Sequence, residues 1–230
     1  MGKFGFYLII EKMRDSLLYL LIGALLGSGI GSFLFAADRK IIDSILSFWF
    51  KRMMFGLEYV GNDYRLWFIL NNLMAFLMII IAIFLIIFMF MKKKKFGNNY
   101  FKSYEEEHPI ITLYSLYMMP IGALIINGAL VSLFLTFTFL DGGFVKFSTA
   151  LSLMMPHGLN EFIALILASS YGLAFIQTIE KLVLKKKWKE IRKISKKIFL
   201  SQITLLFIIF IIILVFFGGI AEGTLSLLLK

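Results

Sequence analysis

Cysteine is absent from this chain of 230 residues, and histidine and proline are rare, with two and three copies. The absence of cysteine excludes disulfides and thiolate-bound metal sites. Acidic residues are also few, because 14 Asp and Glu stand against 24 Lys and Arg, which gives a formal net charge of +10. The chain is rich instead in apolar residues, which make up 60% of it and include 26 phenylalanines.

Apolar runs of about 20 residues recur along the chain, and each is long enough to cross a hydrocarbon core of roughly 30 Å. Such continuous runs exclude a closed β-barrel, whose strands alternate and are about ten residues long. The sequence therefore predicts an all-α fold, a polytopic transmembrane helical bundle that forms a single integral membrane domain over residues 1–230. Five spans are expected, at about 16–37, 65–91, 111–140, 156–179 and 198–217.

Glycines interrupt the first expected span at a spacing of four residues, at Gly23, Gly27 and Gly31. Small residues at this spacing lie on one face of a helix and let a second helix approach closely. We expect this face to pack against another span rather than to act as a hinge.

The distribution of positive charge predicts the orientation. In a five-span model, one side of the membrane holds 17 Lys and Arg and the other side holds 7. The 17 lie in the N-terminal tail, in the loop after the second span and in the segment after the fourth span. Loops rich in Lys and Arg stay in the cytoplasm. The expected localisation is the cell membrane, multi-pass, with the N-terminus cytoplasmic and the C-terminus outside.

Two segments between the spans are distinctive. Residues 38–62 alternate apolar and charged side chains around Trp49, which predicts an amphipathic interfacial helix, with packing on the outer ends of the bundle as an equal alternative. Residues 181–197 are strongly basic around Trp188, which predicts contact with the anionic headgroups of membrane lipids at the cytoplasmic surface and no nucleic acid.

Polar side chains recur at one expected depth in four different spans. At about 1.5 Å per residue, Asn71 and Asn72 lie roughly 10 Å below the outer surface, and the other polar residues fall in the same outer third of the membrane. Polar and ionisable residues inside a membrane usually have partners and often have a function. The candidate polar cluster consists of Asn71, Asn72, Asn127, Pro156, His157, Asn160, Glu161 and Glu222.

The hexapeptide Pro156-His157-Gly158-Leu159-Asn160-Glu161 is the densest part of this cluster. Proline suits the first position of a helix, so we expect the fourth span to begin at Pro156 with its positive dipole end near Glu161. His157 and Glu161 are four residues apart and share a helix face. They could form half of a metal site, but the only other histidine, His108, is expected on the opposite side of the membrane, so no metal and no cofactor are expected. A purely structural network that locks helices together is the leading alternative.

The order of these elements resembles the stage II sporulation protein M family over about residues 71–222. The resemblance implies a membrane scaffold that acts with partner proteins in remodelling the cell envelope and is not itself the hydrolase. The loop 92–109 departs from the family by being more charged. The elements that carry the resemblance are Asn71-Asn72, Asn127-Gly128, Pro156 to Glu161, the small-residue run Ala168-Ser169-Ser170-Tyr171-Gly172, and Ile220-Ala221-Glu222.

Three classes of function compete. The leading hypothesis is a non-enzymatic integral membrane protein that organises unidentified envelope proteins, either as a monomer or as a homo-oligomer. The alternative is a small-solute or ion translocator with a polar site in the outer half of the membrane. An intramembrane hydrolase, in which Glu161 would activate water beside His157, lacks a nucleophile and a second metal-binding element, so an enzyme is not expected.

Overall fold

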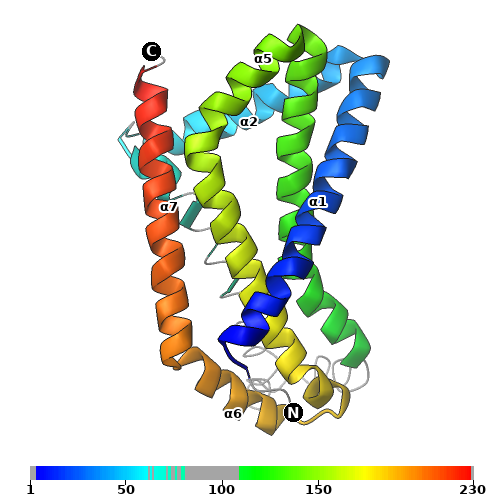
Figure 1. The fold of residues 1–230 in the computed structure, drawn as a ribbon, viewed down its shortest axis with the longest axis vertical. Coiled ribbons are helices and arrows are strands. Elements are labelled where there is room, and N and C mark those ends of the chain that lie inside the picture. The colour runs from blue at the N-terminus through cyan, green and yellow to red at the C-terminus, as the bar shows by residue number, and fades with distance from the viewer. Residues whose placement is uncertain are drawn as a thin grey trace. The chain divides into compact units, whose positions relative to one another are not determined.

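A computed structural model describes residues 4–61, 63, 65–70, 72–73, 76, 79–80 and 109–228, in part by backbone alone. These residues form helices and no strand, which confirms the all-α fold (Figure 1). The helices are α1 (Phe6–Ala37), α2 (Arg39–Tyr59), α5 (Pro109–Leu184), α6 (Trp188–Phe199) and α7 (Gln202–Leu228).

Four helical stretches in the described residues are long and apolar enough to cross a membrane, which supports a multi-pass membrane protein with a helical bundle. They are Phe6–Ala37, Pro109–Met155, Gly158–Leu184 and Gln202–Ala221. The predicted span 65–91 is helical at 65–70 and at the later described positions up to Ile80, and its remainder lies outside the described residues. The predicted amphipathic segment 38–62 contains helix α2.

Two consecutive glycines divide α5. Gly143 has φ of 66° and ψ of −161°, and Gly142 has φ of −143° and ψ of 17°. Positive φ is unfavourable for residues with a Cβ, so glycine is the residue that permits this turn. The helix axis therefore changes direction within two residues, and helix resumes directly afterwards.

The expected start of a helix at Pro156 is wrong. Helix continues without interruption from Phe144 through Pro156 to Leu184, so the proline lies in a helix interior. A proline there lacks the N–H that would bond to the carbonyl of Ser152. Helices within membranes tolerate this where neighbouring groups satisfy the freed carbonyl. The positive end of this helix is consequently near Phe144 and not near Glu161.

The chain forms two compact units, and α1, α5 and α7 contribute to both. Unit 1 comprises 1–17, 76–123 and 165–211. Its core is α5 from Leu165 to Ile176, where every residue is buried. Tyr171 in this stretch contacts the ring of Phe4 edge-on at 5.3 Å between centroids and stacks on Phe207 at 5.4 Å. Phe4, just before α1, and the beginning of α7 thus pack around a fully buried stretch of α5.

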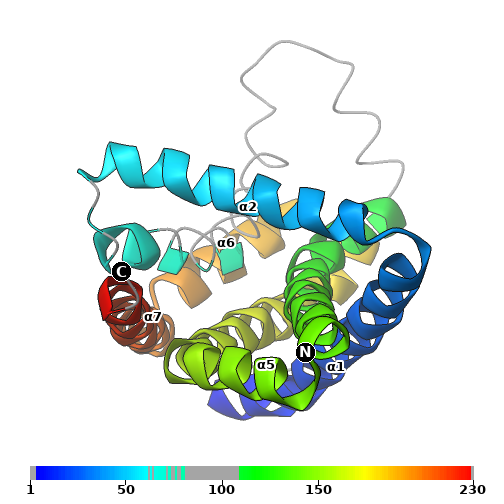
Figure 2. The same cartoon turned by 90° about the horizontal axis from the view of Figure 1, so that it is seen from above.

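Unit 2 comprises 18–75, 124–164 and 212–230. Within it α1 and α5 lie side by side (Figures 1 and 2), and the glycine face of α1 is in contact with the α5 backbone. A Cβ at Gly23 or Gly27 would collide with the carbonyl oxygen of Ile125 or Ala129, and a Cβ at Gly31 would lie 3.3 Å from that of Leu133. The predicted close packing on this face is confirmed.

Candidate functional site: a polar helix pair

The clearest polar contact between distant parts of unit 2 joins Asn72 and Glu161. The Asn72 amide nitrogen donates a hydrogen bond to Oε1 of Glu161, and both residues are half-buried. Asn72 comes from the helical residues after position 65, and Glu161 from α5. A carboxylate accepts hydrogen bonds and an amide nitrogen donates them, so the two groups are complementary. Two residues expected at one depth are therefore direct partners.

The remaining candidates all belong to the sequence ranges of unit 2. Asn127 is exposed on α5 and Asn160 is half-buried, and each makes an interaction. Asn71 lies outside the described residues, as do the side chains of Pro156, His157 and Glu222. The pair Asn72 and Glu161 is thus the part of the predicted cluster that the structure brings together.

Glycine packing also supports this site. A Cβ at Gly219 of α7 would lie 2.7 Å from the backbone nitrogen of Ile69, one turn before Asn72. The helical segment that carries Asn72 therefore packs closely on α7 and is bonded to α5 through Glu161. Gly219 follows Gly218 near the end of the predicted fifth span, and no packing role was predicted for this pair of glycines.

A second polar contact in unit 2 was not predicted. Ser28 and Ser132 share a hydrogen bond of 2.6 Å between their hydroxyl oxygens. The bond joins α1 to α5 between the levels of Gly27 and Gly31, on the face where the backbones are closest. The sequence signal was present, because Ser28 stands among the spaced glycines and serine also favours close helix packing.

An ion-pair cluster joins α2 to α5 just before the Gly142–Gly143 turn. The guanidinium of Arg39 lies 2.5 Å from Oδ1 of Asp141, and the Lys146 ammonium donates to Oδ2 at 2.7 Å. Arg39 also lies over the ring of Phe137, with its guanidinium carbon 5.8 Å from the centroid. One carboxylate thereby holds two cations from different segments at the end of the glycine-packed helices.

In the described part of unit 1, buried hydroxyl groups also join α5 to α1 and to α7. Ser170 donates to the Ser16 hydroxyl at 2.9 Å, which joins α5 to α1. The hydroxyl groups of Tyr171 and Thr204 lie 2.8 Å apart, which joins α5 to α7. Both pairs are buried, and Ser170 and Tyr171 belong to the small-residue run noted in the sequence. This run therefore packs α5 against α1 and α7, and its small side chains allow the neighbouring helices to approach.

The chemistry of these sites is hydrogen bonding between helices. In the described part of the chain no three side chains of His, Asp or Glu are grouped so as to hold a metal ion. The same residues contain one buried side-chain oxygen without a hydrogen bond, the hydroxyl of Ser169. Comparison with known protein families, with curated proteins and with solved structures finds no match.

Proposed function

We propose that this chain is a non-enzymatic integral membrane protein that organises partner proteins at the cell envelope. The observation that carries the proposal is that polar side chains of this protein form hydrogen bonds between helical segments. Asn72 and Glu161, Ser28 and Ser132, Ser16 and Ser170, and Tyr171 and Thr204 each bond one helical segment to another. Satisfied polar contacts of this kind rigidify a protein and specify how its helices pack.

The resemblance to the stage II sporulation protein M family supports the same proposal, because it includes Glu161 and the run around Tyr171. From the apolar runs and the amphipathic segment 38–62 we also propose five spans, with α2 lying along the outer membrane surface. Basic residues support a cytoplasmic N-terminus. The sequence ranges of unit 1 carry 17 Lys and Arg against seven acidic residues, and those of unit 2 carry seven of each. A net positive charge favours the cytoplasmic side.

Photo-crosslinking from membrane-facing positions tests the role as an organiser. A photoreactive residue at Leu205 of α7, which is 60% exposed, is expected to give discrete protein adducts in native membranes. The same residue at Val215, which is fully buried in α7, is the matched control and should give adducts within the chain. A third variant carries the photoreactive residue at Leu25 of α1, which is 74% exposed, and samples a different helix. Adducts with lipid alone from both exposed positions would contradict the proposal.

A second candidate function is a small-solute or ion translocator. It is favoured by one observation, that Asn72 and Glu161 are half-buried and not sealed inside unit 2. Carboxylates within membrane segments commonly mark ion or proton paths. Removing the charge of Glu161 distinguishes the two candidates, because a helix lock would lose stability and a translocator would lose flux.

A further inference from the structure

Helix α6 has two chemically opposite faces. Ile191, Ser195 and Ile198 recur every three or four residues and are buried. At 3.6 residues per turn these positions lie on one side of the helix. The opposite side carries exposed cations, which are Lys189, Arg192, Lys193, Lys196 and Lys197. The helix therefore packs on unit 1 by its apolar face and presents a basic face outward.

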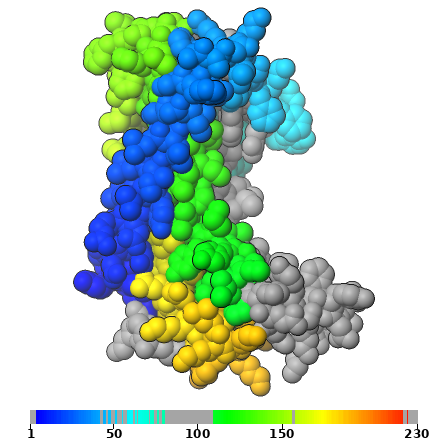
Figure 3. Space-filling view, turned by 90° about the vertical axis from the view of Figure 1, so that its right-hand side faces the viewer, coloured from blue at the N-terminus to red at the C-terminus, as the bar shows by residue number. Residues whose placement is uncertain are grey.

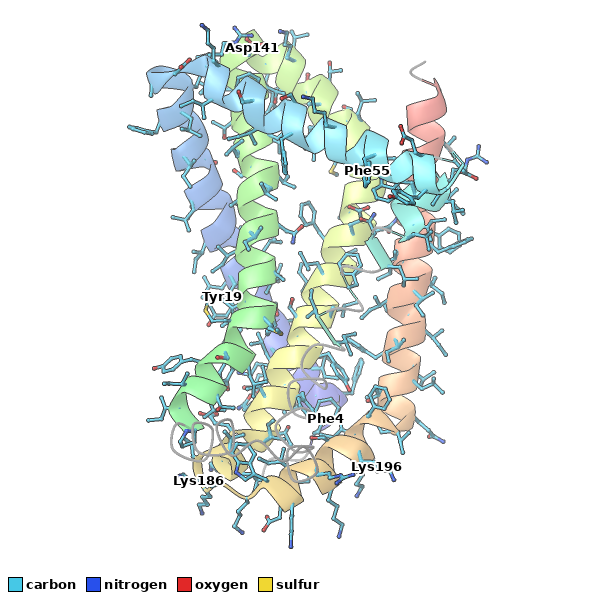
Figure 4. All side chains as sticks on the ribbon, turned by 180° about the vertical axis from the view of Figure 1, so that it is seen from behind. Phe4, Tyr19, Phe55, Asp141, Lys186 and Lys196 are labelled. Atoms are coloured by element: carbon cyan, nitrogen blue, oxygen red, sulfur yellow. The ribbon has the colours of Figure 1, made fainter. Side chains whose placement is uncertain are left out.

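The turn before α6 adds more positive charge. Lys181, Lys185, Lys186 and Lys187 are all exposed, so residues 181–197 present nine cations, which we call the basic surface. Figure 4 shows Lys186 and Lys196 directed away from the helices, and Figure 3 shows the atoms of this segment on the molecular surface. Among the described residues, one ion pair involves this surface, between Lys187 and Glu190 at 2.8 Å.

Lysine at position 186 is unusual for its backbone. Lys186 has a φ of 55°, the left-handed conformation that glycine adopts more readily. Its N–H bonds to the carbonyl of Val183, and the N–H of Lys187 bonds to that of Leu182, the pattern that ends a helix with a left-handed residue. Lysine at this position adds a charge to the basic surface at a cost in backbone strain.

Hydrogen bonds connect the basic surface to the rest of unit 1. Thr204, near the start of α7, donates its hydroxyl to the carbonyl of Ile198 in α6 at 2.6 Å and also lies against the hydroxyl of Tyr171 in α5. Exposed apolar residues lie beside the cations, with Leu184 47% and Phe199 46% exposed at either end of the segment. Cations next to apolar side chains fit a lipid interface, where headgroups and acyl chains meet.

We propose that the basic surface is a binding site for anionic phospholipids, whose phosphate groups contact its lysines and arginines while the flanking apolar residues enter the interface. Charge complementarity identifies this occupant, since a negatively charged membrane surface attracts each nearby Lys or Arg. Because α6 is bonded to α7, which in turn is bonded to α5, lipid bound at this surface stabilises the packing of unit 1.

The test is the melting temperature of the purified protein in detergent micelles during titration with phosphatidylglycerol. We expect the lipid to raise it by several degrees and phosphatidylcholine to leave it unchanged. Lys186→Gly relieves the strained backbone and removes one cation, so it should keep the fold and weaken the lipid response about fivefold. The triple variant Lys189→Gln, Lys193→Gln, Lys196→Gln should abolish the response.

A matched triple variant in unit 2, Lys40→Gln, Lys51→Gln, Arg65→Gln, removes three exposed cations elsewhere and should respond as the wild type does. An equal shift with phosphatidylcholine would overturn the proposal, because charge would then be irrelevant. An equal shift with inorganic phosphate alone would also overturn it, since the ligand would be a free anion. An unchanged response in the α6 triple variant would contradict the assignment to α6.

Discussion

At the scale of single residues, the structure gives Glu161 a specific partner. A carboxylate without hydrogen bonds in an apolar setting costs several kcal/mol or takes up a proton. The amide of Asn72 supplies one such bond from a segment 89 positions away in the sequence. The pair therefore favours the fold in which the segment of Asn72 lies beside α5.

A double-mutant cycle measures the strength of this pair. Asn72→Ala and Glu161→Ala should each destabilise the protein, and the double variant should lose about 1–3 kcal/mol less than the sum of the two. Unfolding free energies in detergent micelles give the coupling. Thr149→Ala is the control, because among the described residues the side chain of this exposed threonine bonds to Val145 of its own helix. Additive effects of Asn72 and Glu161 would contradict a direct interaction.

The proximity of Asn72 and Glu161 was predicted from the sequence, but the helix dipole expected beside Glu161 was not correct. Equal depth in two spans that both run inward placed Asn72 near Glu161, and this inference depends only on span direction and residue count. The expected helix dipole at Pro156 is wrong, because the preference of proline for a helix start was outweighed by the continuation of the helix from Phe144. Local preference does not reveal where a long membrane helix begins.

At the scale of elements, α1 and α5 in unit 2 are held together by close backbone contact. Spaced glycines remove the side chains that would separate them, and Ser28 and Ser132 add a hydrogen bond in the same face. The period of four residues made this face recognisable in the sequence. Its partner was harder to recognise, since Ile125 and Leu133 resemble any other apolar residues of a span. The α5 face contributes a glycine at Gly128, where a Cβ would collide with the carbonyl oxygen of Leu20.

Substitution of the spaced glycines tests this contact. Gly27→Ala places a methyl group against the carbonyl of Ala129, and we expect a loss of about 1–3 kcal/mol in unfolding free energy in micelles. Gly29→Ala is the matched control, two residues away on the same helix with no atom within 4 Å of the added methyl. It should be neutral or stabilising by up to about 1 kcal/mol, because alanine favours helix. Equal effects of the two substitutions would contradict the glycine contact.

The Gly142–Gly143 turn marks the limit of what the sequence pattern reveals about elements. The third span was predicted to end at about residue 140, and in the structure α5 is interrupted at Gly142 and Gly143. The residues beyond the turn were expected to be a connection up to 156, yet they are helical. Their apolar and polar residues have no strong period, so the pattern did not distinguish helix from loop.

At the scale of the whole molecule, composition determined the class. Long apolar runs predicted a helical membrane bundle, and the described helices agree. The topology proposal rests on charge alone. Function was beyond the reach of composition, because the same apolar bundle serves scaffolds and translocators, and the difference lies in how a few polar side chains are used.

Topology can be tested cleanly because the chain has no cysteine of its own. Single cysteines replacing Lys94 and Lys187 should react with a membrane-impermeant thiol reagent only from the cytoplasmic side. A cysteine at Gly142 should react only from outside. This result is expected from the bias of Lys and Arg toward the cytoplasm. Labelling of Lys94→Cys and Lys187→Cys from opposite sides would disprove the five-span topology.

The central claim, that the polar residues hold helices together, is tested most directly with Glu161→Gln. Glutamine keeps the size of the side chain but can donate where the carboxylate only accepts. Melting in micelles and solute or proton flux in liposomes are measured on the same preparations of wild type and variant. A structural role for Glu161 predicts a lower melting temperature, corresponding to roughly 1–3 kcal/mol, and no flux above protein-free liposomes for either protein. An unchanged or raised melting temperature, together with wild-type flux that the substitution abolishes, would contradict it.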